Sequence, residues 1–113
     1  MKIIITENKR ERLALNWLNT KFGNLTKVVK DNETFYVDEN GFPLFLYHQN
    51  EKNKFVYIDD DRIWLFFKSI FGLKFRQARD IVTIWLEETY NLRGYRPFHI
   101  PSHLIVNWQK PII

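Results

Sequence analysis

The side chains best suited to acid–base or metal chemistry in this sequence are its aspartates and its three histidines. Asp59, Asp60 and Asp61 are consecutive, and hard cations bind several carboxylate oxygens at once. Consecutive side chains point in different directions, however, and the spaced ligands of a calcium loop are missing. We therefore predict that these aspartates open a helix, where carboxylates accept hydrogen bonds from free backbone N–H groups and suit the positive end of the helix dipole.

The remaining candidates for metal binding or catalysis are equally weak. His99 and His103 are four residues apart, as zinc ligands on one helix face are, but Pro101 lies between them and disfavours a helix. His48 is far away in the sequence. The Asp-Glu-Asn-Gly segment at 38–41 lacks the ligand spacing of a calcium loop and predicts a tight turn. The sequence has no cysteine, no glycine-rich phosphate loop and no Ser-His-acid set. We predict a non-enzymatic protein without catalytic residues, metal, cofactor or small-molecule substrate.

The charge of the chain is mildly basic and unevenly distributed. Lys and Arg number 17 against 13 for Asp and Glu, a formal net charge of +4. Residues 1–30 and 92–113 carry an excess of basic side chains, and residues 31–62 carry an excess of acidic ones. If the two ends meet, they form a positive face that attracts a polyanion; the alternative is that solvated charges keep a ring-rich protein soluble.

The apolar runs of the sequence indicate where in the cell the protein is expected. No apolar run approaches the roughly 18 residues that a membrane span needs, so no membrane partner is expected. The three isoleucines at 3–5 are too few for the apolar region of a signal peptide. We expect a cytoplasmic location, in a bacterium or a phage-infected host cell.

The first half of the chain predicts a helix followed by strands. A length of 113 residues indicates one domain, residues 1–113. Helical spacing over residues 8–21 predicts a helix with Leu13 on its apolar face, capped by Thr6 and ended by the left-handed conformation of Gly23. Pro43 cannot donate to a ladder, so its strand begins there or lies at an edge. Alternation then predicts an antiparallel meander of three to four strands, at residues 26–29, 35–37, 42–47 and 55–58.

The second half predicts two helices and a tail. Residues 62–71 and 75–91, joined by a turn at Gly72, are expected to form an αα-hairpin packed on the sheet. Residues 93–101 contain two prolines and are expected to cross the surface as an extended tail. Residues 104–108 form a last β-prone run. The predicted fold class is α+β, with an N-terminal helix, the meander, the αα-hairpin and the extended tail.

Aromatic rings are unusually frequent, with ten Phe, five Tyr and four Trp. Large rings are costly to leave in water, and we expect a core of this size to leave several uncovered as a partner surface. The sequence thus predicts a small protein-interaction or structural accessory module that binds itself or another protein. The predicted interaction surface consists of Tyr36, Phe45, Tyr47, Tyr57, Trp64 and Phe67.

Nucleic-acid binding is the alternative function. The two helices within residues 62–91 match a helix-turn-helix in outline, with Gly72 in the turn. Against this, Lys68 occupies a position where the helices approach closely, and Glu87 and Glu88 would repel phosphates. The residues predicted to contact nucleic acid are Arg76, Gln77, Arg79, Arg93 and Arg96.

The opening seven residues, Met1-Lys2-Ile3-Ile4-Ile5-Thr6-Glu7, resemble the start of many short, uncharacterised open reading frames of marine phages and marine metagenomes. The resemblance covers this leader alone. It implies a phage-associated origin and no particular activity.

Overall fold

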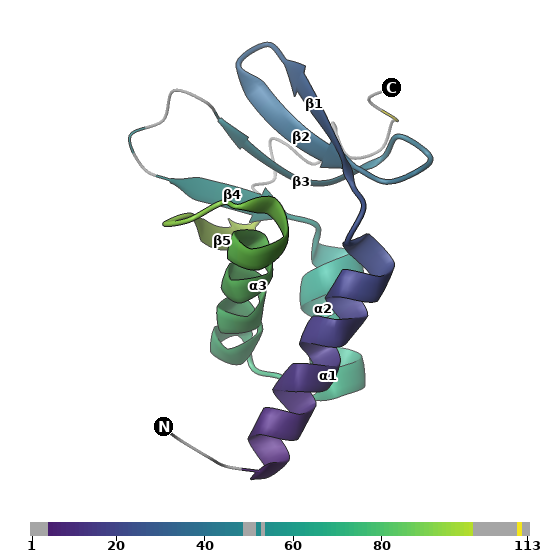
Figure 1. Cartoon of the computed structure of the whole chain (residues 1–113), viewed down its shortest axis with the longest axis vertical. Coiled ribbons are helices and arrows are strands. Elements are labelled where there is room, and N and C mark those ends of the chain that lie inside the picture. The colour runs from purple at the N-terminus through teal and green to yellow at the C-terminus, as the bar shows by residue number, and fades with distance from the viewer. Residues whose placement is uncertain (1–4, 49–51, 53, 101–110, 112–113) are drawn as a thin grey trace.

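The computed structural model describes residues 5–48, 52, 54–100 and 111. Over these residues the chain forms one five-stranded sheet with three helices gathered on one side of it (Figure 1), which confirms the predicted α+β class. None of the described helices is long and apolar enough to cross a membrane. The elements are α1 (Ile5–Phe22), β1 (Thr26–Lys30), β2 (Glu33–Val37), β3 (Pro43–His48), β4 (Phe55–Ile58), the π-helical turn η1 (Asp60–Trp64), α2 (Leu65–Phe71), α3 (Phe75–Tyr90) and β5 (Arg96–His99).

The strands lie in the order β1-β2-β3-β4-β5, and the first three pairings are antiparallel. β5 pairs parallel with β4, so part of the predicted extended tail, residues 96–99, is a fifth strand of the sheet, which the sequence pattern did not predict. Two parallel neighbouring strands are joined only by a long crossover, which here consists of η1, α2 and α3. A local sequence pattern does not indicate a pairing with so distant a strand. The β-prone run at 104–108 lies outside the described residues.

Both edges of the described sheet discourage further strand pairing. The N–H of Arg96 donates to the carbonyl oxygen of Lys54 in the direction of β4, at 2.7 Å. Because backbone groups alternate along a strand, the next residue, Pro97, has its nitrogen on the outer side, where the missing N–H costs no ladder bond. β1 exposes Lys27 and Lys30 at the other edge, and such lysines hinder edge-to-edge association.

Helix α1 starts earlier than predicted, and Leu13 lies off its buried face. It begins at Ile5, so Thr6 lies within the helix and does not cap it. Its buried residues follow one another at intervals of four and are Ala14, Leu18 and Phe22. Leu13, which was predicted on the apolar face, is one residue away from this line and more than half exposed.

The end of α1 is held against α3 by a tyrosine. The hydroxyl of Tyr90 donates to the carbonyl oxygen of Phe22 and accepts the N–H of Leu25. One side chain of α3 thus binds a carbonyl that the helix end leaves free and an N–H of the segment that follows. The helix ends before Gly23, as predicted, but this glycine does not have the predicted positive φ. A glycine is required there because a Cβ would lie only 2.3 Å from the carbonyl oxygen of Asn19.

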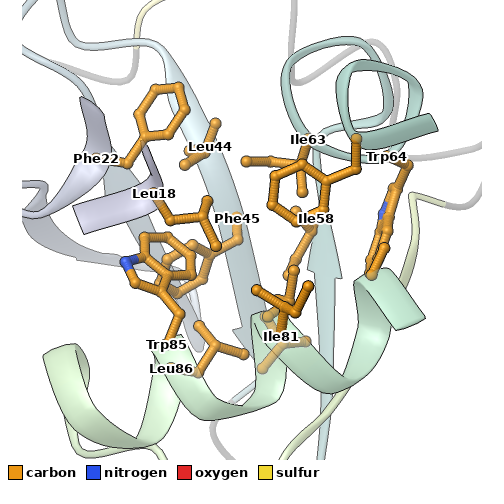
Figure 2. Packing of buried hydrophobic residues seen from close by; sticks show 14 of the residues in the cluster. Leu18, Phe22, Leu44, Phe45, Ile58, Ile63, Trp64, Ile81, Trp85 and Leu86 are labelled. Carbon is orange, nitrogen blue, oxygen red and sulfur yellow. The ribbon is translucent and has the colours of Figure 1, made fainter. Parts of the chain in front are cut away.

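The main core lies between the helices and the sheet (Figure 2). At its centre the Phe45 ring of β3 meets the Trp85 ring of α3 edge to face, with centroids 5.8 Å apart. The Tyr36 ring stacks on Phe45 at 4.5 Å. Alternate residues of β2 and β3 build a second, smaller cluster on the opposite face of the sheet, which contains Phe35, Val37 and Leu46. The protein therefore uses both faces of its sheet to bury apolar side chains.

The Tyr36 hydroxyl makes this core sensitive to alkali. Its burial, helped by repulsion from nearby tyrosinates at Tyr47 and Tyr90, raises the pKa of Tyr36 from 10.0 to about 12. The unfolded chain ionises at the lower pH, so we expect full stability below pH 10 and a decline as the pH rises from 10 to about 12. Urea midpoints measured across this range test the expectation. The Tyr36→Phe variant should decline less steeply; an equal decline in both proteins would show that Tyr36 is not responsible.

Candidate functional site

The structure buries five of the six rings that were predicted to form an interaction surface. Tyr57 is half-buried, and the other five are at most 9% exposed: Tyr36, Phe45, Tyr47, Trp64 and Phe67. Their predicted exposure is wrong because the rings interleave between the helices and the sheet; Phe67, for example, packs edge-on against Trp17 at 5.8 Å. The abundance of rings in this sequence therefore does not produce a ring-covered surface.

A groove of about 440 Å³ opens between α2 and α3, next to the end of β5. We call it the α2–α3 groove. Among the six predicted rings, Trp64 alone contributes to it. The lining residues are Trp64, Leu65, Lys68, Gly72, Leu73, Lys74, Phe75, Ala78 and His99.

The turn between the two helices shapes one side of the groove. Gly72 ends α2 in the left-handed region, with φ 64° and ψ 27°, a conformation that favours glycine. The N–H of Leu73 donates to the carbonyl oxygen of Phe67 at 3.2 Å. The side-chain oxygen of Gln77 accepts the N–H of Lys74 at 3.0 Å. These bonds fix the backbone at the start of α3.

Three rings from three elements form a wall of the groove. The His99 ring of β5 stacks on the Phe75 ring of α3, with centroids 4.8 Å apart and 15° between the planes. The Trp64 ring of η1 lies 4.8 Å from Phe75 and 5.4 Å from His99. His99 Nδ1 is hydrogen-bonded to Asp60 Oδ1 at 2.6 Å. A carboxylate that does not line the groove therefore holds the His99 ring of this wall in place.

The margin of the groove combines apolar surface with positive charge. Leu65 is 51% exposed and Phe75 is 39% exposed. Lys68 and Lys74 are exposed as well, and neither forms an ion pair within the described part of the chain. No Asp or Glu belongs to the lining. In addition, the buried Nε1 of Trp64 has no hydrogen-bond partner among the described residues, although buried indole N–H groups usually find one.

The consecutive aspartates begin the element that carries Trp64. Asp59 Oδ1 accepts the N–H of Arg62 at 2.7 Å, which confirms the predicted capping role. The element that follows is a π-helical turn, however, and the α-helix starts only at Leu65. Asp60 binds His99, as described above. Within the described residues, no group of three or more His, Cys, Asp or Glu side chains could hold a metal ion.

The guanidinium of Arg62 anchors this turn to the sheet. It donates to Asp38 Oδ2 at 2.8 Å and to the carbonyl oxygen of Pro43 at 2.6 Å. Asp38 itself closes the predicted turn at 38–41, because its Oδ1 accepts the N–H groups of Asn40 and Phe42. Arg62 thus ties the turn between β2 and β3 to the turn that carries a wall of the groove.

The residues of the nucleic-acid alternative do not form one surface. Arg79 and Arg96 line a second pocket of about 400 Å³ between α3 and β5, together with Glu87, Tyr95 and Phe98. Gln77 is engaged at the start of α3. Arg76 and Arg93 are exposed and belong to neither pocket. The structure therefore brings together two of the five predicted residues.

The two described histidines lie at different places in the fold. His48 Nδ1 lies 3.4 Å from Glu33 Oε2 at the end of β3, whereas His99 belongs to the groove wall. His103 lies outside the described residues.

Sequence reasoning missed most of the groove. It treated Lys68 only as an obstacle to close helix packing and gave Leu65 no role. A usable signal was present: Leu65 and Phe75 are large apolar residues at the starts of two helices that flank a single turn. Whether such residues are covered depends on a third element, here β5, whose position the sequence did not indicate.

No protein-family model, no curated protein and no solved structure matches this chain. A functional assignment therefore depends on the geometry of the groove.

We expect Arg62→Ala to lower the free energy of unfolding by about 2 kcal/mol, because it removes two charge-assisted hydrogen bonds and leaves the nearly buried Asp59 without its cation. Arg12→Ala is the matched control, since Arg12 is exposed on α1, and it should change stability by less than about 0.5 kcal/mol. Urea unfolding measures both. Equal effects of the two substitutions would show that Arg62 does not anchor the turn.

Proposed function

We propose that this protein is a small, non-enzymatic protein-interaction module that holds an apolar segment of a protein partner in the α2–α3 groove. The observation that carries the proposal is the exposure of two large apolar side chains, Leu65 and Phe75, at the margin of a concave surface. Exposed apolar side chains gathered around a concavity are typical of binding sites. The partner is a second protein, and the expected setting remains the cytoplasm of a bacterium or a phage-infected cell.

The size of the groove suits side chains of a peptide segment. A volume of about 440 Å³ lies within the range of natural ligand pockets, and the walls are aromatic and aliphatic. Burying one Leu or Phe anchor contributes about 1.5–3 kcal/mol. An anchor of this kind alone gives weak binding, so residues on either side of it must add contacts with the margin.

A library of short random peptides displayed on phage and selected on the whole protein tests the proposal. We expect Leu65→Glu to weaken binding of the selected peptides at least tenfold, or about 1.4 kcal/mol, because it places a charge on the apolar margin. Val29→Glu is the matched control, since Val29 on β1 is 55% exposed and lies outside the groove. Both variants are first checked for an unchanged unfolding midpoint. Peptides that bind the two variants equally well would refute docking in the groove.

A second candidate function, nucleic-acid binding, is supported by the pocket between α3 and β5. Two guanidinium groups, Arg79 and Arg96, lie there beside the rings of Tyr95 and Phe98. Arginines beside aromatic rings suit the phosphates and stacked bases of a single strand. Glu87 lines the same pocket and opposes a phosphate, which is why we place this function second.

Titration with single-stranded DNA at low and moderate salt decides the second candidate. If the protein binds nucleic acid, its affinity for single-stranded DNA falls steeply as the salt concentration rises, because contacts with phosphates release counterions. The double variant Arg79→Gln/Arg96→Gln should then lose most of the binding, while Leu65→Glu keeps it. Absence of binding at about 50 mM salt would eliminate this function.

A further inference from the structure

The charged side chains that line the α2–α3 groove are lysines. Lys68 of α2 and Lys74 of the following turn line it, and the lining contains no carboxylate. Asp60 lies outside the lining and is hydrogen-bonded to His99 Nδ1 at 2.6 Å. The side-chain ammonium of neither lysine forms an ion pair with a described residue. The positive charge at the margin is therefore not neutralised by an ion pair within the described part of the chain.

We infer that the segment held in the groove is acidic, with an apolar anchor residue flanked by carboxylates. This inference rests on the proposed docking function and specifies the chemistry of the partner. The anchor packs against the exposed side chains of Leu65 and Phe75, and the flanking carboxylates lie opposite Lys68 and Lys74. Opposite charges across an interface favour the right partner and repel basic ones.

Other occupants fit the groove less well. A second copy docked groove to groove would bring the lysine pairs of two chains together, with like charges opposed. The phosphates of a nucleic acid would pair with the lysines, but they would make no apolar contact with the exposed side chains of Leu65 and Phe75. A lipid surface is bound by apolar side chains that enter it, such as those on the face of an interfacial helix, whereas Trp64 and Leu73 are buried at the sides of a concavity.

Peptide selection on two forms of the whole protein tests the inference. On the wild type, we expect peptides that depend on Leu65 to be enriched in Asp and Glu around an apolar residue. The charge-reversed variant Lys68→Glu/Lys74→Glu should bind these peptides at least tenfold more weakly and should itself select peptides rich in Lys and Arg. The matched control, Lys27→Glu/Lys30→Glu on β1, reverses two exposed lysines at the far sheet edge and should leave affinity within twofold. The neutral pair Lys68→Gln/Lys74→Gln, expected to give an intermediate loss, replaces the reversed variant if that variant does not fold.

The outcomes separate this inference from the docking function. If no peptide depends on Leu65, both fail. If peptides depend on Leu65 but carry no excess of acidic residues, the docking function stands and the acidic partner is overturned. Dimers in sedimentation experiments that Leu65→Glu abolishes would assign the groove to a second copy and overturn the inference. Binding to anionic phospholipid vesicles that is lost in the Lys68→Glu/Lys74→Glu variant would overturn it as well.

Discussion

The contacts of Arg62 hold together parts of this protein that are distant in the sequence. Its guanidinium bridges Asp38 in the turn after β2 and the first carbonyl of β3, while its backbone N–H is capped by Asp59. The cation also lies 3.6 Å from the nearly buried carboxylate of Asp59, whose burial without a cation would be costly. The next two residues, Ile63 and Trp64, enter the core and the groove wall directly from this anchor. The junction thus fixes where the element that carries Trp64 leaves the sheet.

Local patterns predicted those elements whose structure is decided locally. The helix predicted at residues 75–91 is present as α3, and its buried residues follow helical spacing: Ala78, Ile81, Val82, Trp85 and Leu86. Pro43 begins its strand and Asp59 caps its turn, because both roles depend on the backbone of one or two residues. The predictions were wrong where contacts between residues distant in the sequence decide which side chains are buried and which strands pair. Ala14 replaces Leu13 in the core because α1 is rotated to suit its neighbours, and β5 joins the sheet across three helical segments.

The expected ring surface was wrong for a reason of packing. A count of rings treats each one as a separate volume to be covered, whereas rings cover one another when they stack or meet edge to face. Trp17 lies flat against Phe66 at 4.2 Å and edge-on to Phe22 and Phe67, so one half-buried indole shields several neighbours. A second cluster on the opposite face of the sheet takes further apolar side chains. Aromatic content therefore says little about exposure until the number of packed layers is known.

The groove could not be predicted because strand β5 was not predicted. The parallel register pairs Ile58 of β4 with His99 of β5, and Asp60 follows Ile58 by two residues. This register brings His99 to the Asp60 carboxylate, and the imidazole then supports Phe75 at the start of α3. Without β5, Phe75 and Leu65 are two unrelated apolar residues near a glycine turn. With β5 in place, they become the margin of a concavity with an aromatic wall and two lysines without ion pairs, so the long-range pairing that completes the sheet also completes the groove.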